Sequence, residues 1–295
     1  MKKFTSVTII YNPKSTGDGE KLAKKLKADL KQKGFLQKVL LKATEHAGHA
    51  EDIAYKQAMS STRALIISSS GDGGYNEVVN GIMKAQSEGA SPVAGLLPAG
   101  NANDHFKNIY KNDSTTSILK HSTQCIDLLS LEPTKNKKSF QKYAHSYIGI
   151  GLTPKLGEQL NQTKLNRINE IIISFKNLLL FEPVDIKHHE AVYSYYSIVA
   201  ANIKTMSKVL ELSKDTSVSD GRFELITFEK TNKRKLFIIL LKSAILGLKT
   251  EKSVKKFSFK TIEPTLIQLD GEVYKLDSNS DVKVAIKRQK LECLL

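Results

Sequence analysis

The first third of the chain alternates short apolar runs with amphipathic segments. The apolar runs, which predict β-strands, cover residues 7–11, 37–41, 64–68 and 93–97. The segments between them place apolar side chains at helical spacing and predict helices over residues 20–33, 46–59 and 75–83. This alternation is typical of a parallel sheet with helices on both faces, whose ligand lies beyond the carboxyl ends of the strands. The loops that leave each strand are therefore the candidate binding loops.

From about residue 125 onward, apolar and polar residues alternate with a period of two. This pattern predicts strands at residues 140–150, 192–201, 223–228, 257–262 and 282–286. Two apolar stretches of helical character interrupt it, at residues 165–181 and 235–248. We therefore expect an α/β N-terminal domain with a parallel sheet over residues 1–124 and a mostly antiparallel β-sandwich domain over residues 125–287. The tail, residues 288–295, is expected to return to the N-terminal domain.

The balance of charged residues points to an anionic partner. Lys and Arg number 45 against 30 Asp and Glu, which gives a formal net charge of +15 and a pI near 9.5. Nucleic acid, a phosphorylated small molecule and an acidic membrane surface all fit this charge. Only five of the basic residues are arginines, and lysine lacks the planar fork that reads a base edge. A phosphorylated ligand or a membrane surface is thus favoured, and nucleic acid is not expected as a partner.

Cysteine usage and hydropathy indicate a cytoplasmic protein that can lie on a membrane but cannot cross one. Cys125 and Cys293 form no metal-ligand spacing, and the sequence opens without an apolar signal segment. A reducing compartment is the expectation for such a chain. The apolar stretch 236–248 contains Lys242 and is shorter than the roughly 20 residues that span a bilayer. The segment 165–181, with apolar residues on one helical face and basic residues beside them, is the candidate membrane contact, although a helix of this kind is more often part of the core.

Three loops of small polar residues follow the predicted strands. The first, residues 12–19, places backbone N–H groups, hydroxyls and Lys14 before a helix, which is typical of phosphate binding although the Walker A spacing is missing. The second, residues 68–77, has glycines around Asp72, which can hold a hydrated Mg²⁺ or a ribose hydroxyl, or cap a helix. The third covers residues 97–104. Ordinary turns use the same residue types, so the interpretation depends on all three loops meeting at one sheet edge.

These segments resemble the diacylglycerol kinase catalytic-domain family, which includes soluble bacterial lipid kinases and relatives acting on sphingoid lipids. The family's Asn-Pro-x-Ser-Gly, Gly-Gly-Asp-Gly-Thr and Glu-Val-x-Asn-Gly segments resemble residues 12–16, 70–74 and 77–81. Its Pro-x-Gly-Thr-x-Asn-Asp-Phe, Asp-Gly-x-Leu and Asp-Gly-Glu segments are similar to residues 98–106, 220–223 and 270–272. The resemblance implies an N-terminal domain like that of phosphofructokinases and NAD kinases.

The resemblance also implies an activity and a set of site residues. The activity is transfer of a phosphoryl group from ATP, with Mg²⁺, to a hydroxyl of diacylglycerol or a related lipid at an anionic membrane surface. Glu272, with Asp270 beside it, is implied to take the proton from that hydroxyl. A Mg²⁺ ion is implied at the side chain of Asp220, with the carbonyl groups of Ser217 and Arg222 as further ligands. The ATP site is implied at Asn12, Pro13, Lys14, Ser15, Thr16, Thr44, Ser70, Gly71, Asp72, Gly73, Gly74, Tyr75, Asn76 and Asn101.

Several alternatives stay open. Ser70 stands where the family has Gly, Gly74 where it has Thr, and Asn101 where the third motif has Thr, so a catalytically silent protein that binds nucleotide or lipid is one alternative. A kinase of a soluble acceptor such as NAD is another, because NAD kinases share the Gly-Gly-Asp-Gly loop. Asp270 and Gly271 also fit a tight hairpin turn without any catalytic role. A homodimer is compatible with the sequence.

Overall fold

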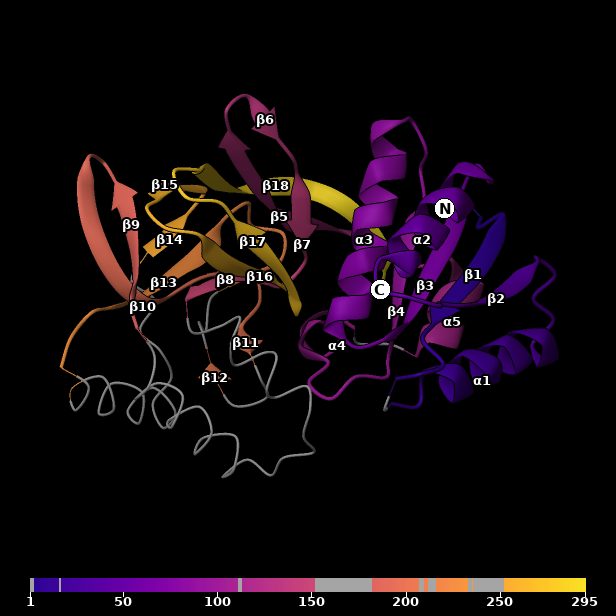
Figure 1. Cartoon of the computed structure of the whole chain (residues 1–295). Coiled ribbons are helices and arrows are strands. Elements are labelled where there is room, and N and C mark those ends of the chain that lie inside the picture. The colour runs from indigo at the N-terminus through magenta and orange to yellow at the C-terminus, as the bar shows by residue number, and fades with distance from the viewer. Residues whose placement is uncertain are drawn as a thin grey trace. The chain divides into compact units, whose positions relative to one another are not determined.

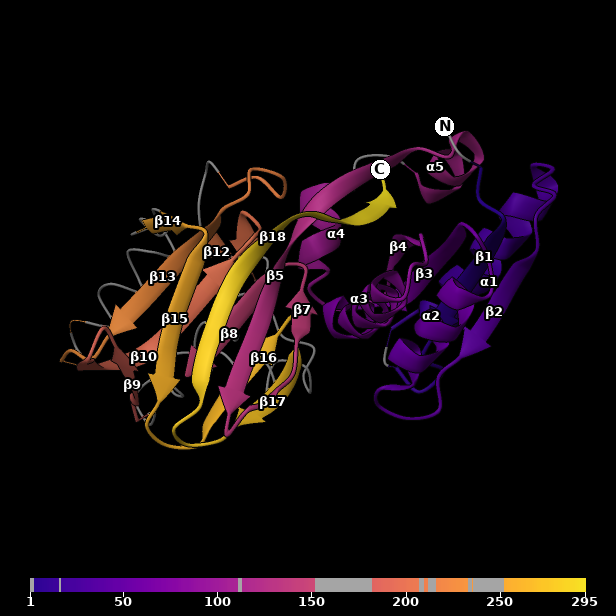
Figure 2. The same cartoon turned by 90° about the horizontal axis from the view of Figure 1, so that it is seen from above.

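The computed structural model describes two compact units of the chain (Figures 1 and 2). The N-terminal unit consists of Met1–Ile126 and Gln289–Leu295, and the C-terminal unit of Asp127–Arg288. The pattern change near residue 125 therefore lies close to the division in the structure. The residues described are 3–15, 17–110, 113–151, 182–206, 210–211, 216–232, 235 and 252–295. The predicted helical stretch 165–181, Thr16 and nearly all of 235–248 lie outside them.

The N-terminal unit is an α/β structure built on a parallel sheet. Its sheet has the order β2-β1-β3-β4, and all three pairings are parallel. The last residues of the chain add to it, since Cys293 lies opposite Ala94 in a parallel pairing. In chain order the elements are β1 (Ser6–Tyr11), α1 (Gly19–Gln32), β2 (Val39–Ala43), α2 (His49–Met59), β3 (Ala64–Ser70), α3 (Asp72–Ser87), β4 (Val93–Pro98), α4 (Asp104–Ile109) and α5 (Ser114–Lys120).

The central strands of this sheet are buried on both faces. Ile9 and Ile10 on β1, and Leu65, Ile66 and Ile67 on β3, are all at most 1% exposed. A parallel strand covered by helices on both sides needs apolar residues at consecutive positions, which is the pattern seen in the sequence. The predicted parallel sheet is confirmed.

Helices α2 and α3 are joined by Glu77 and Gly81. The Glu77 carboxylate accepts the backbone N–H groups of Gly48 and Ala50 at 3.0 and 3.1 Å, at the start of α2. These N–H groups have no partner within their own helix. One turn further along α3, a Cβ atom on Gly81 would lie 2.2 Å from the carbonyl oxygen of Glu51. The segment 77–81 therefore fixes the packing of two helices.

Replacing Gly81 with Ala is expected to destabilise the N-terminal unit. The added methyl group has no room against α2, and overpacking of this kind costs about 1–3 kcal/mol. Thermal or denaturant unfolding measures the change. Ser87→Ala, at the exposed end of the same helix, is the control and should alter stability by less than about 0.5 kcal/mol. Equal stability of both variants would contradict this packing argument.

The C-terminal end of the chain is held in the N-terminal unit by an ion pair. The Arg63 guanidinium donates to the Glu292 carboxylate through two hydrogen bonds, from Nη1 at 3.0 Å and from Nη2 at 2.5 Å. The Thr123 hydroxyl donates to the same carboxylate at 2.6 Å. Two parallel hydrogen bonds of this kind fix geometry as well as supplying energy. The end of β18 is thereby fastened beside β4.

The C-terminal unit is dominated by antiparallel strands. Along the order β17-β16-β8-β10-β9-β15-β18, each neighbouring pair is antiparallel. Figure 2 shows β5, β18 and β15 running side by side. Two strands, β5 (Thr123–Lys135) and β18 (Asp281–Leu294), continue into the N-terminal unit. The others are β6 (Lys138–Ser139), β7 (Lys142–Ala144), β8 (Tyr147–Gly151), β9 (Val184–His188), β10 (Ala191–Ala201), β11 (Thr205–Met206), β12 (Leu210–Glu211), β13 (Phe223–Glu229), β14 (Lys252–Val254), β15 (Lys256–Thr261), β16 (Thr265–Leu269) and β17 (Glu272–Leu276).

Alternate side chains of these strands form one hydrophobic core. It includes Leu129, Ile148, Ile198, Phe223, Phe259, Ile267 and Val284, each at most 4% exposed. Period-two patterning is what places such residues on a common face, so the predicted antiparallel β domain is confirmed. Among the residues that the structure describes, no helix is long and apolar enough to cross a membrane.

The predicted strand at residues 140–150 is wrong in one respect, because the structure divides it into β7 and β8. The division falls at His145 and Ser146. Their backbone N–H groups donate to the carboxylate of Asp270, at 2.6 and 3.0 Å, and not to a neighbouring strand. A residue more than a hundred positions away thus ends the strand, and local alternation carries no sign of it.

Candidate functional site

The predicted binding loops all lie at the carboxyl edge of the N-terminal sheet. Tyr11 at the end of β1 pairs with Ala43 and Ser69, and Ser70 pairs with Pro98. The strands therefore end nearly level with one another. The loops that follow β1, β3 and β4 leave the sheet as neighbours, as the parallel topology predicts.

Glycines let the three loops touch through their backbones. A Cβ atom on Gly17 would lie 1.8 Å from the carbonyl oxygen of Ala99, and one on Gly100 would lie 2.3 Å from the Cα atom of Gly71. The Ser69 hydroxyl also donates to the carbonyl oxygen of Gly19 at 2.7 Å. Side chains at these glycines would push the loops apart. Their absence lets the loop backbones meet at Gly17, Gly71 and Gly100, and we call this meeting point the cradle. Glycine-rich backbone of this kind can approach a polyphosphate closely.

The first loop forms a compact turn around Asn12. The Asn12 side-chain oxygen accepts the backbone N–H of Lys14 at 2.9 Å, and its carbonyl oxygen accepts the Ser15 hydroxyl at 2.9 Å. The side chains of residues 12–15, including Pro13, are exposed. Thr44, the residue after β2, donates its backbone N–H to the carbonyl oxygen of Tyr11 at 2.9 Å and lies beside the start of this loop. Lys14 is therefore available to a ligand at this edge.

The second loop is tied to the third by Asp72. The two carboxylate oxygens of Asp72 accept the backbone N–H groups of Asp104 and His105, each at 3.1 Å, at the start of α4. Asp72 thus acts as a helix cap, one of the two roles considered from the sequence, but for a neighbouring helix and not its own. Within the third loop, the Asn103 side-chain oxygen accepts the backbone N–H of Gly100, and the Asn103 side-chain NH₂ group donates to the carbonyl oxygen of Gly100, both at 2.8 Å. Asn101 is exposed beside this turn.

Asp72→Ala is expected to weaken nucleotide binding as well as stability. Loss of a helix cap costs about 0.5–2 kcal/mol, and here it also frees the third loop from the second. Asp113→Ala is a matched control, because the Asp113 side chain caps α5 through the N–H of Thr116 at 3.1 Å. Both variants should melt earlier, but only Asp72→Ala should lose affinity in a titration with Mg-ATP. Equal affinities in the two variants would count against the loop assignment.

Two of the predicted ATP-site residues have their side chains inside the unit. Tyr75 and Asn76 are both 0% exposed. The Asn76 side-chain oxygen accepts the Asn80 amide at 3.1 Å within α3. A ligand over this loop would therefore meet the backbone at residues 71–76, together with the half-buried side chains of Ser70 and Asp72. The role of Tyr75 and Asn76 in binding stays a prediction.

In the C-terminal unit, Asp270 and Glu272 flank a tight hairpin turn. Leu269 pairs with Glu272, so Asp270 and Gly271 are the two turn residues, with φ of 50° and 109°. Positive φ at both positions is the type I′ geometry that Asp-Gly favours. The hairpin expected for Asp270 and Gly271 is therefore present, and it presents Glu272 as the first residue of β17, partly exposed.

Asp270 is fully buried, and its carboxylate organises the neighbouring backbone. It accepts N–H groups from His145, Ser146 and Tyr147 at 2.6, 3.0 and 2.8 Å. The His145 ring nitrogen Nε2 lies 3.3 Å from the same carboxylate. A carboxylate engaged in this way holds the turn in place, which favours a positioning role for Asp270. Glu272 is the better placed of the two to meet a substrate.

The predicted metal-binding turn is organised by hydrogen bonds. The Asp220 carboxylate is exposed and accepts the backbone N–H groups of Arg222 and Ser217 at 2.8 and 3.3 Å. Across the described ranges, no group of three or more His, Cys, Asp or Glu side chains could hold a metal ion. A cation at this turn would depend on one carboxylate and on main-chain carbonyls. Magnesium binding by Asp220, Ser217 and Arg222 stays a prediction.

The sequence interpretation did not single out Asp127. This residue is 0% exposed, and its carboxylate accepts the backbone N–H of Gly221 at 2.6 Å, next to the Asp220 turn. Its one signal in the sequence is a charged residue between Ile126 and Leu128 in an otherwise apolar run. Buried carboxylates need such partners, so an acidic residue inside a strand pattern indicates a backbone contact elsewhere in the fold.

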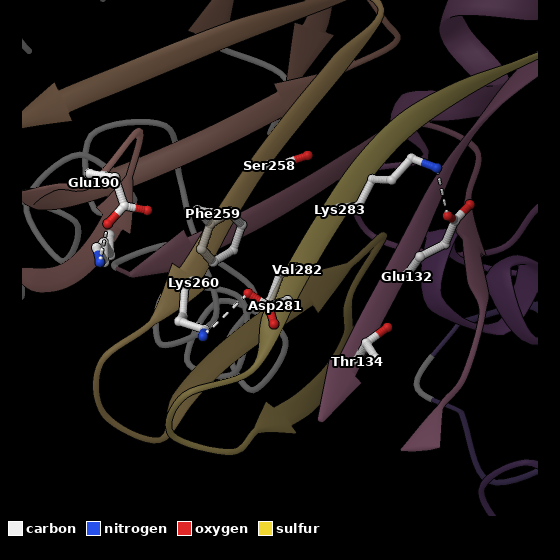
Figure 3. Close-up of a pocket in the computed structure, with 10 residues that line it drawn as sticks. Glu132, Thr134, Glu190, Ser258, Phe259, Lys260, Asp281, Val282 and Lys283 are labelled. Atoms are coloured by element: carbon white, nitrogen blue, oxygen red, sulfur yellow. Dashed lines mark hydrogen bonds and ion pairs between the residues drawn. The ribbon is translucent and has the colours of Figure 1, made fainter. Parts of the chain in front are cut away.

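A separate depression of about 380 Å³ lies in the C-terminal unit over β5, β9, β15 and β18 (Figure 3). Partial burial raises the pKa of Glu132, but hydrogen bonds from Lys287, Lys283 and Ser130 outweigh it and hold the pKa at about 2. Each lysine that lines the depression forms an ion pair with a carboxylate. The depression is therefore a weaker candidate for a phosphate-binding site than the three loops. The pairs are Lys187 with Glu190, Lys260 with Asp281, and Lys283 with Glu132.

Comparison with known proteins confirms the family resemblance. Residues 6–131 match the family model described as "Diacylglycerol kinase catalytic domain". The chain is 28% identical over 237 residues to "Diacylglycerol kinase" of Bacillus subtilis (strain 168), with 76% of this chain and 74% of that protein covered. It is 26% identical over 279 residues to "Diacylglycerol kinase" of Staphylococcus carnosus (strain TM300), with 90% and 87% covered.

Solved structures share the fold. A crystal structure of a diacylglycerol kinase from Bacillus anthracis str. Sterne has a TM-score of 0.70 at 17% identity, with 100% of this chain and 98% of that chain covered. Yeast NADH kinase complexed with NADH has a TM-score of 0.50 at 10% identity, with 100% and 84% covered. At these identities the likeness supports the fold class alone, which agrees with the one expected from the sequence.

Proposed function

We propose that this chain, whose residues 6–131 match the diacylglycerol kinase catalytic domain, is a kinase that transfers the γ-phosphoryl group of ATP to a lipid hydroxyl. The observation that carries the proposal is the convergence of three loops on one backbone-lined cradle at Gly17, Gly71 and Gly100. Such a cradle fits the phosphates of a nucleotide, which need N–H donors at close range. The curated relatives named diacylglycerol kinase support a lipid as the acceptor.

The residues at the cradle have the chemistry that a nucleoside triphosphate needs. Backbone N–H groups at the start of α3 would donate to phosphate oxygens, and the exposed Lys14 ammonium would add a positive charge. Magnesium, when bound with ATP, supplies neutralisation of the phosphate charge. Asp72 holds the second and third loops together, so the cradle keeps its shape before the nucleotide arrives.

Phosphoryl transfer asks little covalent chemistry of the protein. The lipid hydroxyl oxygen forms a bond to the γ-phosphorus, the bond from that phosphorus to the β,γ-bridging oxygen breaks, and ADP leaves. The proton of the hydroxyl goes to the Glu272 carboxylate as general base. Asp270, whose buried carboxylate binds backbone N–H groups, would act by positioning Glu272 through the hairpin turn.

The acceptor would be met at an anionic membrane surface, with the protein bound peripherally. A formal net charge of +15 favours this contact, because each lysine close to an anionic bilayer contributes about 1 kcal/mol. Diacylglycerol, which has a free hydroxyl and no headgroup charge, is the acceptor that we propose.

An acceptor panel tests the proposed function. The protein is incubated with Mg-ATP labelled at the γ-phosphate and with diacylglycerol, sphingosine, NADH or NAD, the lipids being supplied in anionic or zwitterionic vesicles. We expect labelled diacylglycerol product, formed faster on anionic vesicles and lost when EDTA removes the magnesium. Label on NADH or NAD alone would replace the lipid acceptor with a soluble one. Absence of label on every acceptor, with ATP still bound, would leave a silent nucleotide-binding protein.

A further inference from the structure

Ser70 and Gly74 occupy one shared space at the start of α3. A Cβ atom on Gly74 would lie 2.7 Å from the Ser70 hydroxyl oxygen and 2.8 Å from the Ser70 Cβ atom. Rotation of the hydroxyl can relieve the first contact, but the second involves an atom fixed to the backbone. The structure therefore has room for a side chain at residue 70 or at residue 74, and not at both.

The Ser70 hydroxyl oxygen lies 2.7 Å from the position that a Cβ atom at residue 74 would take, next to the cradle. Ser70 ends β3 opposite Pro98, where the third loop starts, and it is only partly buried. Gly74 lies in the first turn of α3, whose N-terminus receives no hydrogen bond from its own cap side chain, since the cap residue is Gly71. The first backbone N–H groups of a helix have no partner within it, so Ser70 adjoins the groups that would bind a phosphate.

Ser70 can give its proton to a ligand without leaving a partner unsatisfied. Its hydroxyl donates to the carbonyl oxygen of Gly71 at 2.9 Å, and that oxygen also accepts the N–H of Tyr75 at 3.1 Å. The hydroxyl of Ser68, 2% exposed, lies 2.7 Å from Ser70 and can donate to it. When the Ser70 hydroxyl donates to a phosphate oxygen instead, the carbonyl oxygen of Gly71 still accepts the N–H of Tyr75. The Ser70 oxygen still accepts the hydroxyl of Ser68.

We propose that Ser70 is the phosphate-positioning hydroxyl of this loop, and that Ser70 and Gly74 form an exchanged pair. The sequence differs from the resembled motif at both positions at once, with Ser for Gly at residue 70 and Gly for Thr at residue 74. The two differences compensate: the hydroxyl that the motif carries on Thr at residue 74 is carried here by Ser70, and the Gly at residue 74 leaves room for it. This inference rests on the proposed nucleotide site, and it removes Gly74 as a reason to consider the chain silent.

A set of variants separates the steric part of this inference from the hydroxyl. Ser70→Gly removes the hydroxyl and makes room, whereas Ser70→Ala removes the hydroxyl and keeps the Cβ atom. Either change is expected to weaken Mg-ATP binding by about 2- to 12-fold, the loss for one hydrogen bond. Gly74→Thr alone should lower the melting temperature and weaken binding, because its side chain overlaps Ser70.

The double variants give the decisive comparison. Ser70→Gly with Gly74→Thr should return both the melting temperature and the Mg-ATP affinity to within about 2-fold of the original protein, if one hydroxyl replaces the other. Ser70→Ala with Gly74→Thr should stay defective, because the Cβ atom that this variant keeps at residue 70 still blocks residue 74. Ser87→Ala, which loses a hydroxyl at the far end of α3, is the control and should change neither quantity.

Two results would overturn the inference. Equal melting temperatures and Mg-ATP affinities in the two double variants would show that residues 70 and 74 do not compete for one space. Unchanged affinity in both Ser70→Gly and Ser70→Ala would show that the Ser70 hydroxyl does not contribute to binding. Failure of the proposed function is distinguishable from these results. If the original protein binds Mg-ATP but phosphorylates no acceptor, the affinities still decide the hydroxyl role. If it binds no nucleotide, the hydroxyl role falls with the proposed function, and the melting temperatures alone decide the shared space.

Discussion

Glu272→Gln is expected to abolish phosphoryl transfer while nucleotide affinity stays unchanged. Glutamine keeps the size of the side chain and the hairpin turn before it, but it cannot take a proton at neutral pH. A positioned general base contributes roughly 10²- to 10⁴-fold in rate, and a loss of this size should appear in kcat. Transfer of labelled phosphate to diacylglycerol measures the rate, and a titration with Mg-ATP measures the affinity.

Another glutamate of the C-terminal unit, at the opposite end of the β16–β17 hairpin, provides the matched control for this variant. Glu263 lies on the exposed turn before β16 and plays no part in the proposed site, so Glu263→Gln should retain the original rate. If Glu272→Gln phosphorylates diacylglycerol at the rate of the control, Glu272 is not the general base. A loss of ATP affinity together with rate would instead assign Glu272 to nucleotide binding.

Asp270→Ala is expected to unfold the C-terminal unit at much lower denaturant concentration. The change leaves the backbone N–H groups of three consecutive residues, 145–147, without their buried acceptor. Each unsatisfied buried donor costs about 1–3 kcal/mol, so the free energy of unfolding should fall by about 3 kcal/mol or more. Urea unfolding followed by circular dichroism checks the value. Asp281→Ala, which removes an exposed carboxylate from the same unit, should change stability by less than about 0.5 kcal/mol.

Asp270→Asn distinguishes positioning from catalysis. Asparagine keeps one acceptor oxygen, so this variant should fold and should show an intermediate loss of stability. If Asp270 acts through the hairpin, Asp270→Asn should keep partial activity under conditions in which the variant is folded. Complete loss of activity in a variant as stable as the original protein would instead make Asp270 a catalytic residue.

The sequence predicts the N-terminal sheet well because burial on both faces leaves long apolar runs. The segments around Ile9 and Ile66 could be assigned as strands without any knowledge of their neighbours. Once the strands are parallel, the meeting of their loops at one edge follows from topology. The contacts between Gly17 and Ala99 and between Gly71 and Gly100 add a close fit that residue types alone do not show.

Roles that depend on distant partners could not be predicted from local pattern. In the sequence Asp72 resembles a metal ligand or a cap of its own helix, yet its carboxylate caps α4, because β3 and β4 are neighbours and the loops that follow them meet. The break at His145 is set by Asp270 across 125 positions of sequence. The compensation between Ser70 and Gly74 likewise becomes visible only when the Cβ position of residue 74 is placed in space.

The proposed nucleotide site consists of the three loops of the N-terminal unit. Hydrogen–deuterium exchange of the whole chain, with and without Mg-ATP, tests this assignment. We predict that nucleotide slows exchange in peptides covering residues 12–19, 70–76 and 98–104 together. Nucleotide binding that protects other peptides and leaves these three unchanged would place the nucleotide outside the three loops.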